Sequence, residues 1–350
     1  MTPPARRDDL VEILHGVAVA DPYRWLEDAT SEETKAWVAD NNRITREALD
    51  ARPDRVRWHE RLVALTRLRV VGGAAVRGER LFAWEREPGG QQMGVSLRSA
   101  LDPAAPARML LDPGEWSEDA TTAIDWFVPS RDGRLLAYGV SDGGTERSVL
   151  RVLDVETRTH LVDEIPDTRA CSLSWLPDGE GFAYTRFAPN DEYGRRIYLH
   201  HLGDDWAADE LVWGEDVEPE VWADVSLSPD GRWLLVHAMH GWGRIDVTLL
   251  DRRSGTWADV IVGVDATNGF EVDGDRLVGL TTLDAPRGRI VTAPLASPGE
   301  WTTLVPETES VRGGFEIVGD EVLSVASRHA VDRLERHRLA DGEFIGTVDG

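Results

Sequence analysis

The stretch Ser228-Pro229-Asp230-Gly231-Arg232-Trp233-Leu234-Leu235-Val236 decides the fold of this chain. Its first half predicts a tight turn, because proline presets φ at the second turn position and glycine readily takes a positive φ. Its second half is rich in β-forming residues and too short for a helix, so a buried strand should follow the turn. The stretch matters because its pattern recurs along the chain.

Close copies of this turn-and-strand pattern occur at 130–138 and 176–184, and weaker copies occur at 76–82, 272–278 and 317–323. The turn glycines of the six copies are spaced 43 to 55 residues apart and are Gly78, Gly133, Gly179, Gly231, Gly274 and Gly319. A period of about 40–50 residues with several strands per unit is typical of propeller blades, which bury one another's faces. We therefore expect a mainly β fold, a β-propeller with six visible blade-like units. A β-sandwich with chance turn resemblances is the alternative.

Composition and charge exclude several classes of function. The formal net charge of −25 repels nucleic acid and anionic membranes. No apolar run approaches the ~20 residues of a transmembrane helix, and the polar N-terminus lacks the apolar core of a signal peptide. The only cysteine, Cys171, rules out a disulfide framework and fits a reducing compartment. We expect a cytoplasmic protein without nucleic-acid or membrane partners, in which Cys171 is a buried structural thiol.

The region before the repeats carries signals of a different kind. Its first 20 residues suggest irregular structure. Thr30 and Glu33 have the spacing of a capping box at the start of one helix, and Pro53 suits the first turn of a second helix. We expect residues 1–69 to form an N-terminal helical segment and residues 70–350 to form the propeller.

The histidines and tryptophans do not indicate a ligand site. His200 and His201 are adjacent on a predicted strand and therefore point to opposite faces, and His237 and His240 also diverge. Among the 14 tryptophans, those in strand positions such as Trp175 are expected in blade cores, with a sugar-binding aromatic platform as the residual alternative. The sequence thus assigns no cofactor-binding or metal-ligating residue, and we expect no cofactor.

Residues 21–28, Asp-Pro-Tyr-Arg-Trp-Leu-Glu-Asp, together with 31–38 and Asn41-Asn42, closely resemble the N-terminus of prolyl oligopeptidases. Residues 126–139 and 284–291 are similar to propeller stretches of that family, and the resemblance covers essentially the whole chain. It implies a cytosolic serine peptidase that cuts short peptides after proline. In that family a seven-bladed propeller admits oligopeptides and caps an α/β-hydrolase domain, on which the N-terminal helical segment packs.

The chain departs from the family pattern because no catalytic domain is visible in it. A nucleophile elbow requires Gly-x-Ser-x-Gly, and the nearest match, Gly94-Val95-Ser96, lacks the closing glycine. No catalytic residue can therefore be assigned. We expect a chain truncated before its last blade and its hydrolase domain, inactive alone, whose partners are that missing domain and an oligopeptide substrate. The alternative is a stand-alone propeller that binds peptides or a protein partner.

Overall fold

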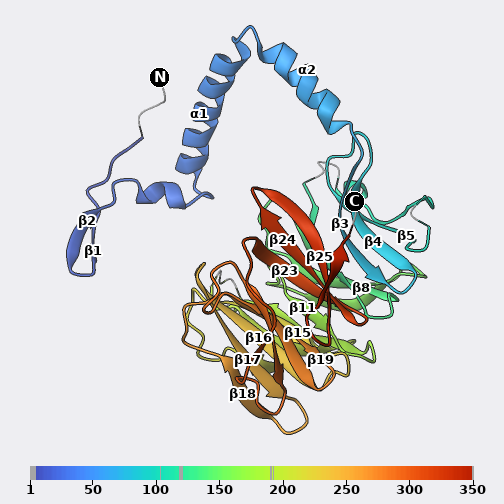
Figure 1. The fold of residues 1–350 in the computed structure, drawn as a ribbon. Helices are drawn as coiled ribbons and strands as arrows, with labels where there is room; N and C mark the ends of the chain where they lie inside the picture. Colours follow the sequence, from blue (N-terminus) through green and yellow to red (C-terminus); the bar gives the residue numbers. More distant parts are fainter. Residues whose placement is uncertain (1–4, 103, 118–120, 190, 192, 349–350) are drawn as a thin grey trace. The chain divides into compact units, whose positions relative to one another are not determined.

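The computed structural model describes residues 5–102, 104–117, 121–189, 191 and 193–348. The chain forms two compact units, drawn in Figure 1. The first unit comprises Met1–Arg69 with Glu87–Gly89, and the second comprises Val70–Arg86 with Gly90–Gly350. Helices occur mainly in the first unit, whereas the second is built from β-sheets.

The first unit begins with a β-hairpin, so the expectation of irregular structure over the first 20 residues was wrong. Strands β1 (Val11–Leu14) and β2 (Val17–Ala20) pair antiparallel. The two turn residues between them, His15 and Gly16, have φ of 51° and 80°, the backbone that a two-residue hairpin turn requires. The hairpin was not predicted because its strands are short and mostly exposed. Their sequences therefore show no alternation of buried apolar and exposed polar residues.

Two helices follow the hairpin, α1 (Glu32–Asp50) and α2 (Arg55–Thr66). The cap of α1 is Ser31, not Thr30: the Ser31 Oγ accepts from the Thr34 backbone N–H at 3.2 Å. The Thr30 hydroxyl is engaged elsewhere, because it donates to the Asp28 carboxylate at 2.7 Å. Helix α2 starts two residues after Pro53, so this proline precedes the helix instead of lying in its first turn.

The aromatic stretch at 21–28 ties the hairpin to α1 through side-chain contacts. It contains the short 3-10 helix η1 (Arg24–Glu27). The Arg24 guanidinium lies 2.5 Å from carboxylate oxygens of Glu12 and Asp21. The Trp25 indole donates to the Arg6 carbonyl at 2.9 Å and packs edge-on against Trp37. Residues of this stretch therefore connect the hairpin, the N-terminal strand-flanking segment at Arg6 and helix α1. No helix in the described part of the chain is long and apolar enough to cross a lipid bilayer.

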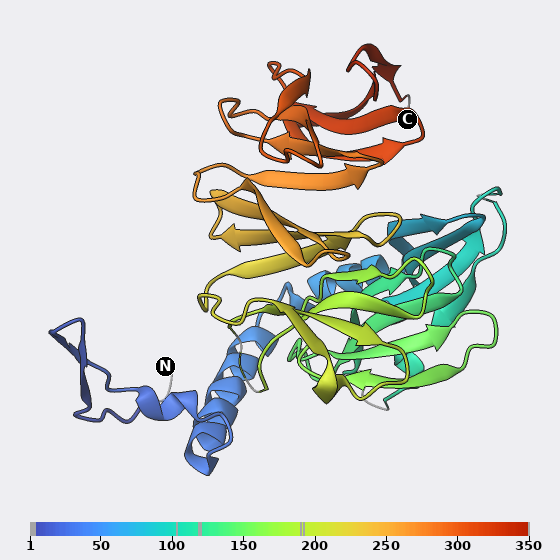
Figure 2. The ribbon, with the colours of Figure 1, turned by 90° about the horizontal axis from the view of Figure 1, so that it is seen from below.

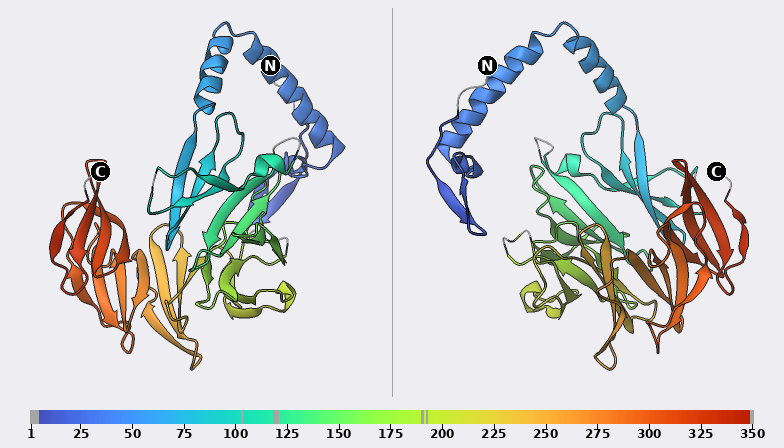
Figure 3. Two further views of the ribbon diagram at one scale, coloured as in Figure 1. Left: turned by 90° about the vertical axis from the view of Figure 1, so that its right-hand side faces the viewer. Right: turned by 60° about the vertical axis from the view of Figure 1, so that its left-hand side comes forward.

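The second unit consists of six four-stranded antiparallel sheets, each with its strands in chain order, which we call blades 1 to 6. The colours of Figures 2 and 3 follow these blades from blue-teal to red. The strands of blades 1 to 3 are β3 (Val70–Arg77), β4 (Arg80–Arg86), β5 (Gly94–Ser99), β6 (Arg108–Leu111), β7 (Ala123–Pro129), β8 (Leu135–Ser141), β9 (Val149–Asp154), β10 (His160–Ile165), β11 (Leu173–Trp175), β12 (Gly181–Arg186), β13 (Arg196–His201) and β14 (Glu210–Trp213). Short 3-10 turns, η2 (Pro113–Glu115) and η3 (Trp206–Ala208), lie after β6 and before β14.

The strands of blades 4 to 6 are β15 (Trp222–Leu227), β16 (Trp233–His240), β17 (Arg244–Asp251), β18 (Thr256–Ile261), β19 (Asn268–Asp273), β20 (Arg276–Thr281), β21 (Arg289–Pro294), β22 (Thr302–Val305), β23 (Val311–Val318), β24 (Glu321–Arg328), β25 (Val331–Arg338) and β26 (Phe344–Thr347). The predicted mainly β, propeller architecture with six blades is confirmed.

Each repeated turn joins the first and second strands of one blade. The six turn glycines all have a positive φ, between 57° and 75°. In blade 4 the Ser228 hydroxyl donates to Asp230 at 2.6 Å and accepts from the Trp233 N–H at 2.9 Å. Asp230 in turn accepts from the Arg232 N–H. The turn is thus closed by its own side chains, which explains why the pattern could be read from sequence.

Five buried apolar clusters hold the blades together, and each lies between two consecutive blades. Blades 2 and 3, for example, share a cluster that contains Leu150, Trp175 and Phe182. The other four clusters join blades 1 and 2, 3 and 4, 4 and 5, and 5 and 6. Among the described residues none of the five joins blade 6 to blade 1. Apolar side chains of these two blades, such as Val71 and Val331, remain exposed.

Blade 5 contains a glycine whose replacement should be costly. A Cβ added at Gly279 would lie 2.7 Å from Cγ of Phe270 on the paired strand and closer still to the ring edge. We expect Gly279→Ala to lower the free energy of unfolding by about 1–3 kcal/mol, the usual cost of overpacking a core. Chemical denaturation measures the loss. The matched control is Gly269→Ala, because a Cβ there meets no atom within 4 Å; equal losses in both variants would contradict the steric argument.

Candidate functional site

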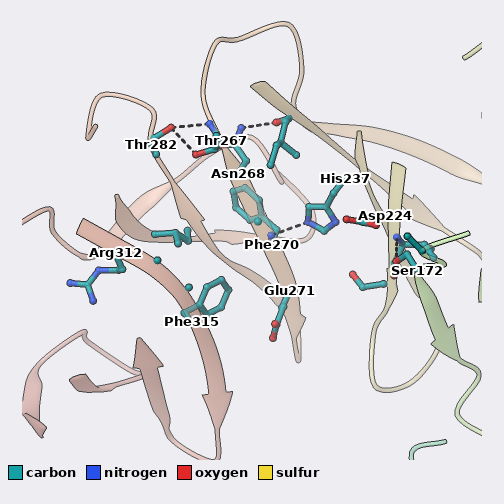
Figure 4. A pocket seen from close by; sticks show the side chains of 18 of the residues that line it. Ser172, Asp224, His237, Thr267, Asn268, Phe270, Glu271, Thr282, Arg312 and Phe315 are labelled. Atoms are coloured by element: carbon teal, nitrogen blue, oxygen red, sulfur yellow. Dashed lines mark hydrogen bonds between the residues drawn. The ribbon is translucent and has the colours of Figure 1, made fainter. Parts of the chain in front are cut away.

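A pocket with a volume of about 700 Å³ lies on the first strands of blades 3 to 6 of the propeller (Figure 4). Its lining comes from 170–172 at the start of β11, 224–226 on β15, 267–271 on β19 and 312–315 on β23. Side chains from β16 and β20 complete the wall. This volume is in the usual range for sites that bind small organic ligands.

Strand alternation decides which side chains reach the pocket. On β19, Phe270 is buried in the core shared by blades 4 and 5, so its neighbour Glu271 points to the opposite face. On β15, Ala223 and Val225 are buried in the same way, and Asp224 and Ser226 face the pocket. The pocket wall therefore combines polar side chains such as Asp224 and Glu271 with apolar ones such as Phe270 and Phe315.

Around this pocket, polar side chains of one blade accept hydrogen bonds from backbone N–H groups of the next blade. The Ser172 hydroxyl accepts from the Val225 N–H at 3.0 Å, which links blade 3 to blade 4. The His237 Nε2 accepts from the Phe270 N–H at 3.0 Å, which links blade 4 to blade 5. The unpaired edges of the innermost strands are thereby closed, and the pocket wall is held by hydrogen bonds between blades.

His237 is a neutral structural residue in this arrangement. Burial lowers its pKa to about 4. Because Nε2 accepts a hydrogen bond, the ring proton resides on Nδ1. His237 therefore offers the pocket a neutral imidazole and not a positive charge.

Cys171 is also unreactive. Its thiol donates to the Thr185 carbonyl at 3.3 Å, and burial raises the thiol pKa to about 11. The expectation of a buried structural thiol is confirmed. No serine, threonine or cysteine of the pocket lining hydrogen-bonds to a histidine within the described residues.

Glu271 differs from the other pocket residues because its carboxylate has no partner. It makes no hydrogen bond or ion pair with any described residue. Burial, together with a smaller contribution from the nearby Glu316 carboxylate, raises the pKa of Glu271 to about 7. The Arg312 guanidinium contacts Ser324 and Glu335 and does not neutralise Glu271; Figure 4 shows it directed away from the Glu271 carboxylate.

A second polar cluster lies outside the pocket, buried between blades 2 and 3. The His200 imidazole lies 3.0 Å from Asp163 and 2.9 Å from Asp209, and the Tyr184 hydroxyl donates to Asp209 at 2.7 Å. Burial alone would lower the pKa of His200, but the hydrogen bonds that the imidazole donates to the two carboxylates outweigh it and raise the pKa. His201 is exposed on the same strand, so the prediction that these two histidines face opposite sides is confirmed. Within the described ranges, no group of three or more His, Cys, Asp or Glu side chains is arranged so that it could hold a metal ion.

Sequence reasoning named neither Glu271 nor the aspartates around His200. The chain has 63 acidic residues, and nothing local separates these from the rest. The alternation Phe270-Glu271-Val272 is the one available signal, because it places Glu271 opposite two core residues. That signal predicts that Glu271 faces away from the blade core, but it does not predict that the carboxylate lacks a partner.

Comparison with known proteins agrees with this architecture. Residues 3–349 match the family model described as the N-terminal β-propeller domain of prolyl oligopeptidase. A prolyl endopeptidase of Elizabethkingia meningoseptica is 29% identical over 318 residues, which cover 87% of this chain and 44% of that protein. A prolyl oligopeptidase of Omphalotus olearius is also 29% identical, over 99% of this chain and 53% of its own length.

Solved structures extend the similarity to three dimensions. A prolyl endopeptidase structure from a study of inter-domain dynamics superposes with a TM-score of 0.90 at 28% identity, over 100% of this chain and 53% of that one. Prolyl oligopeptidase B from Galerina marginata, bound to a 35mer substrate, has the same fold with a TM-score of 0.85 at 20% identity. The chain thus spans about half the length of the relatives it matches. It belongs to the prolyl oligopeptidase family and corresponds to the N-terminal β-propeller domain of these peptidases.

Proposed function

We propose that this chain is the propeller portion of a prolyl oligopeptidase-like serine peptidase that hydrolyses short peptides after proline. The observation that carries the proposal is the match of residues 3–349 to the propeller domain of that family. In this role the propeller admits oligopeptides and excludes large folded proteins. Catalysis requires an α/β-hydrolase domain, since the pocket lining contains no nucleophile paired with a base.

Exposed apolar surface on the first unit supports a partner domain. Helix α2 has no buried residue, and its Trp58 and Leu62 side chains are 57% and 59% exposed. Large apolar side chains of this kind on one helix mark an interaction surface. We assign this face of α2 to the contact with the hydrolase domain.

The experiment compares the native polypeptide with the purified 350-residue chain. An antibody raised against the chain measures the mass of the native polypeptide in the cells that make it, and the captured protein is assayed on a chromogenic Gly-Pro peptide. We expect a polypeptide about twice this length, as in the relatives, that cleaves after proline. The purified chain alone should be inactive.

Size selection is tested with the same Gly-Pro sequence placed inside a folded protein, which the native polypeptide should leave uncut. A native polypeptide of 38.8 kDa without peptidase activity would overturn the proposal. In that case the chain would be a stand-alone binding module, and the pocket would be its binding site.

A further inference from the structure

We propose that the pocket on the first strands of blades 3 to 6 binds the cationic group of an oligopeptide, an ammonium or a guanidinium, through the Glu271 carboxylate. That the ligand is a peptide rests on the proposed function, whereas the preference for a cation rests on the pocket alone. The argument starts from Glu271, a largely buried carboxylate that lines the pocket without a hydrogen-bonding or ionic partner among the described residues.

Partial burial beside a like charge disfavours the ionised form of a carboxylate, and a cation bound next to it would favour that form. Here one neighbouring charge adds to the effect of burial. Glu316 on β23 acts on Glu271 directly. Asp224 on β15 also lines the pocket, but it is paired with Arg195. A cation in the pocket would offset both the cost of desolvating the Glu271 carboxylate and its repulsion from Glu316.

The basic groups near the pocket are already engaged. The Arg312 side chain, which is 2% exposed, contacts Ser324 and Glu335. The Arg195 side chain, which is 1% exposed, lies 3.4 Å from Asp224 and stacks over the Trp222 ring. His237 on β16 is neutral, because burial lowers its pKa to about 4. No basic group near the pocket therefore neutralises Glu271, which leaves its carboxylate available to a cation from outside the described chain.

The remaining polar groups of the pocket fit a peptide better than a bare metal ion. The buried Ser226 Oγ lacks a hydrogen-bond partner, and His237 carries a ring N–H on Nδ1. These groups can pair with an N–H and a carbonyl of a peptide backbone, while Glu271 takes the charge. A metal would require three or more convergent ligands, and the described residues contain no such group.

Binding is measured by calorimetry on the 350-residue chain at pH 8, where Glu271 is ionised. The probes are acetyl-Gly-Arg-Gly-amide and its citrulline analogue, which differ in the side-chain charge, and Gly-Gly-Gly-amide with a free or an acetylated amino end. At least one cationic probe should bind roughly tenfold more tightly than its neutral analogue, as expected for a charge-assisted hydrogen bond. The pair that shows this difference identifies the source of the cation.

Glu271→Gln keeps the shape of the side chain and should abolish the difference. Glu180→Gln, on the exposed turn of blade 3, should retain it. Lowering the pH from 8 to 5.5 protonates Glu271 and should weaken cation binding in the wild-type chain but not in Glu271→Gln, since His237 stays neutral over this range. The unfolding midpoint of Glu271→Gln, measured in parallel, should not fall, because the variant removes an unpaired buried charge.

Three outcomes would overturn the inference. Equal binding of charged and neutral probes would leave a peptide pocket, consistent with the proposed function, but without a preference for cations. A preference that survives in Glu271→Gln would place the cation elsewhere. If no probe binds, the pocket is not a peptide site. The proposed function would then still be tested independently, by the peptidase assay on the native polypeptide.

Discussion

Replacing His200 with alanine is expected to lower the free energy of unfolding by about 3–5 kcal/mol, the range for removal of one partner from a buried ion pair. The imidazole is fully buried and lies within 3.0 Å of two carboxylates, Asp163 and Asp209. Without it, both carboxylates would remain buried between blades 2 and 3 with no cation to pair with. Chemical denaturation followed by tryptophan fluorescence measures the loss.

His201 provides the matched control because it is the next residue on the same strand and is exposed. His201→Ala should change the free energy of unfolding by no more than about 0.5 kcal/mol, as for most surface positions. Similar losses in the two variants would show that the strand, and not the buried ion pair, is sensitive to substitution.

The pH dependence of the same cluster follows from the direction of its pKa shift. The pKa of His200 is raised above its ordinary value of 6.5 in the folded protein. The folded state therefore holds the proton more tightly, and the cluster's stabilisation is fully present below pH 6.5. It is lost as the pH rises from 6.5 through the raised value. The difference in unfolding free energy between wild type and His200→Asn should shrink over that window; a difference independent of pH would contradict the assignment of a charged imidazole.

Trp175→Ala should cost about 3–5 kcal/mol of unfolding free energy, because it deletes a large buried ring from the interface between blades 2 and 3. The Trp175 side chain is 2% exposed and packs edge-on against Phe182, with ring centroids 5.2 Å apart. Its indole N–H also donates to the Val128 carbonyl of blade 2 at 3.0 Å. The substitution therefore leaves a cavity and an unpaired carbonyl. Both lower the free energy of unfolding, and thermal or chemical denaturation measures their sum.

Trp242 is the corresponding control, since it lies in the loop between β16 and β17 and is 97% exposed. Trp242→Ala removes the same atoms from the surface and should leave the unfolding midpoint nearly unchanged. If both tryptophan variants lost stability equally, burial between the blades would not explain the effect of Trp175.

The propeller could be predicted from sequence because its signals are local. A Ser-x-Asp-Gly turn closes on its own side chains, as at Ser228 and Asp230, so the pattern survives without tertiary context. The hairpin at Val11–Ala20 could not be predicted in this way, because its strands bury too little to show periodicity. The helix cap shifted from Thr30 to Ser31 because Asp28 competes for the threonine hydroxyl, a choice that depends on three-dimensional geometry.

The pocket could not be predicted from the sequence for a related reason. Glu271 is distinguished only by what is missing around it, and its surroundings come from strands of three other blades. The buried cluster at His200 likewise joins Asp163 from blade 2 to a histidine 37 residues later. Strand alternation predicts the side to which each residue points, but not which charges meet there.

The pairwise arrangement of the five apolar clusters has a consequence for how the chain is made. Because each cluster needs only two consecutive blades, a blade emerging from the ribosome can bury its face as soon as the next one has been synthesised. Apart from the outer face of blade 1, the growing polypeptide therefore exposes at any moment little more than the face of its newest blade. Assembly of the propeller is in this respect sequential, like the stacking of a linear repeat array, although the finished blades surround a common centre.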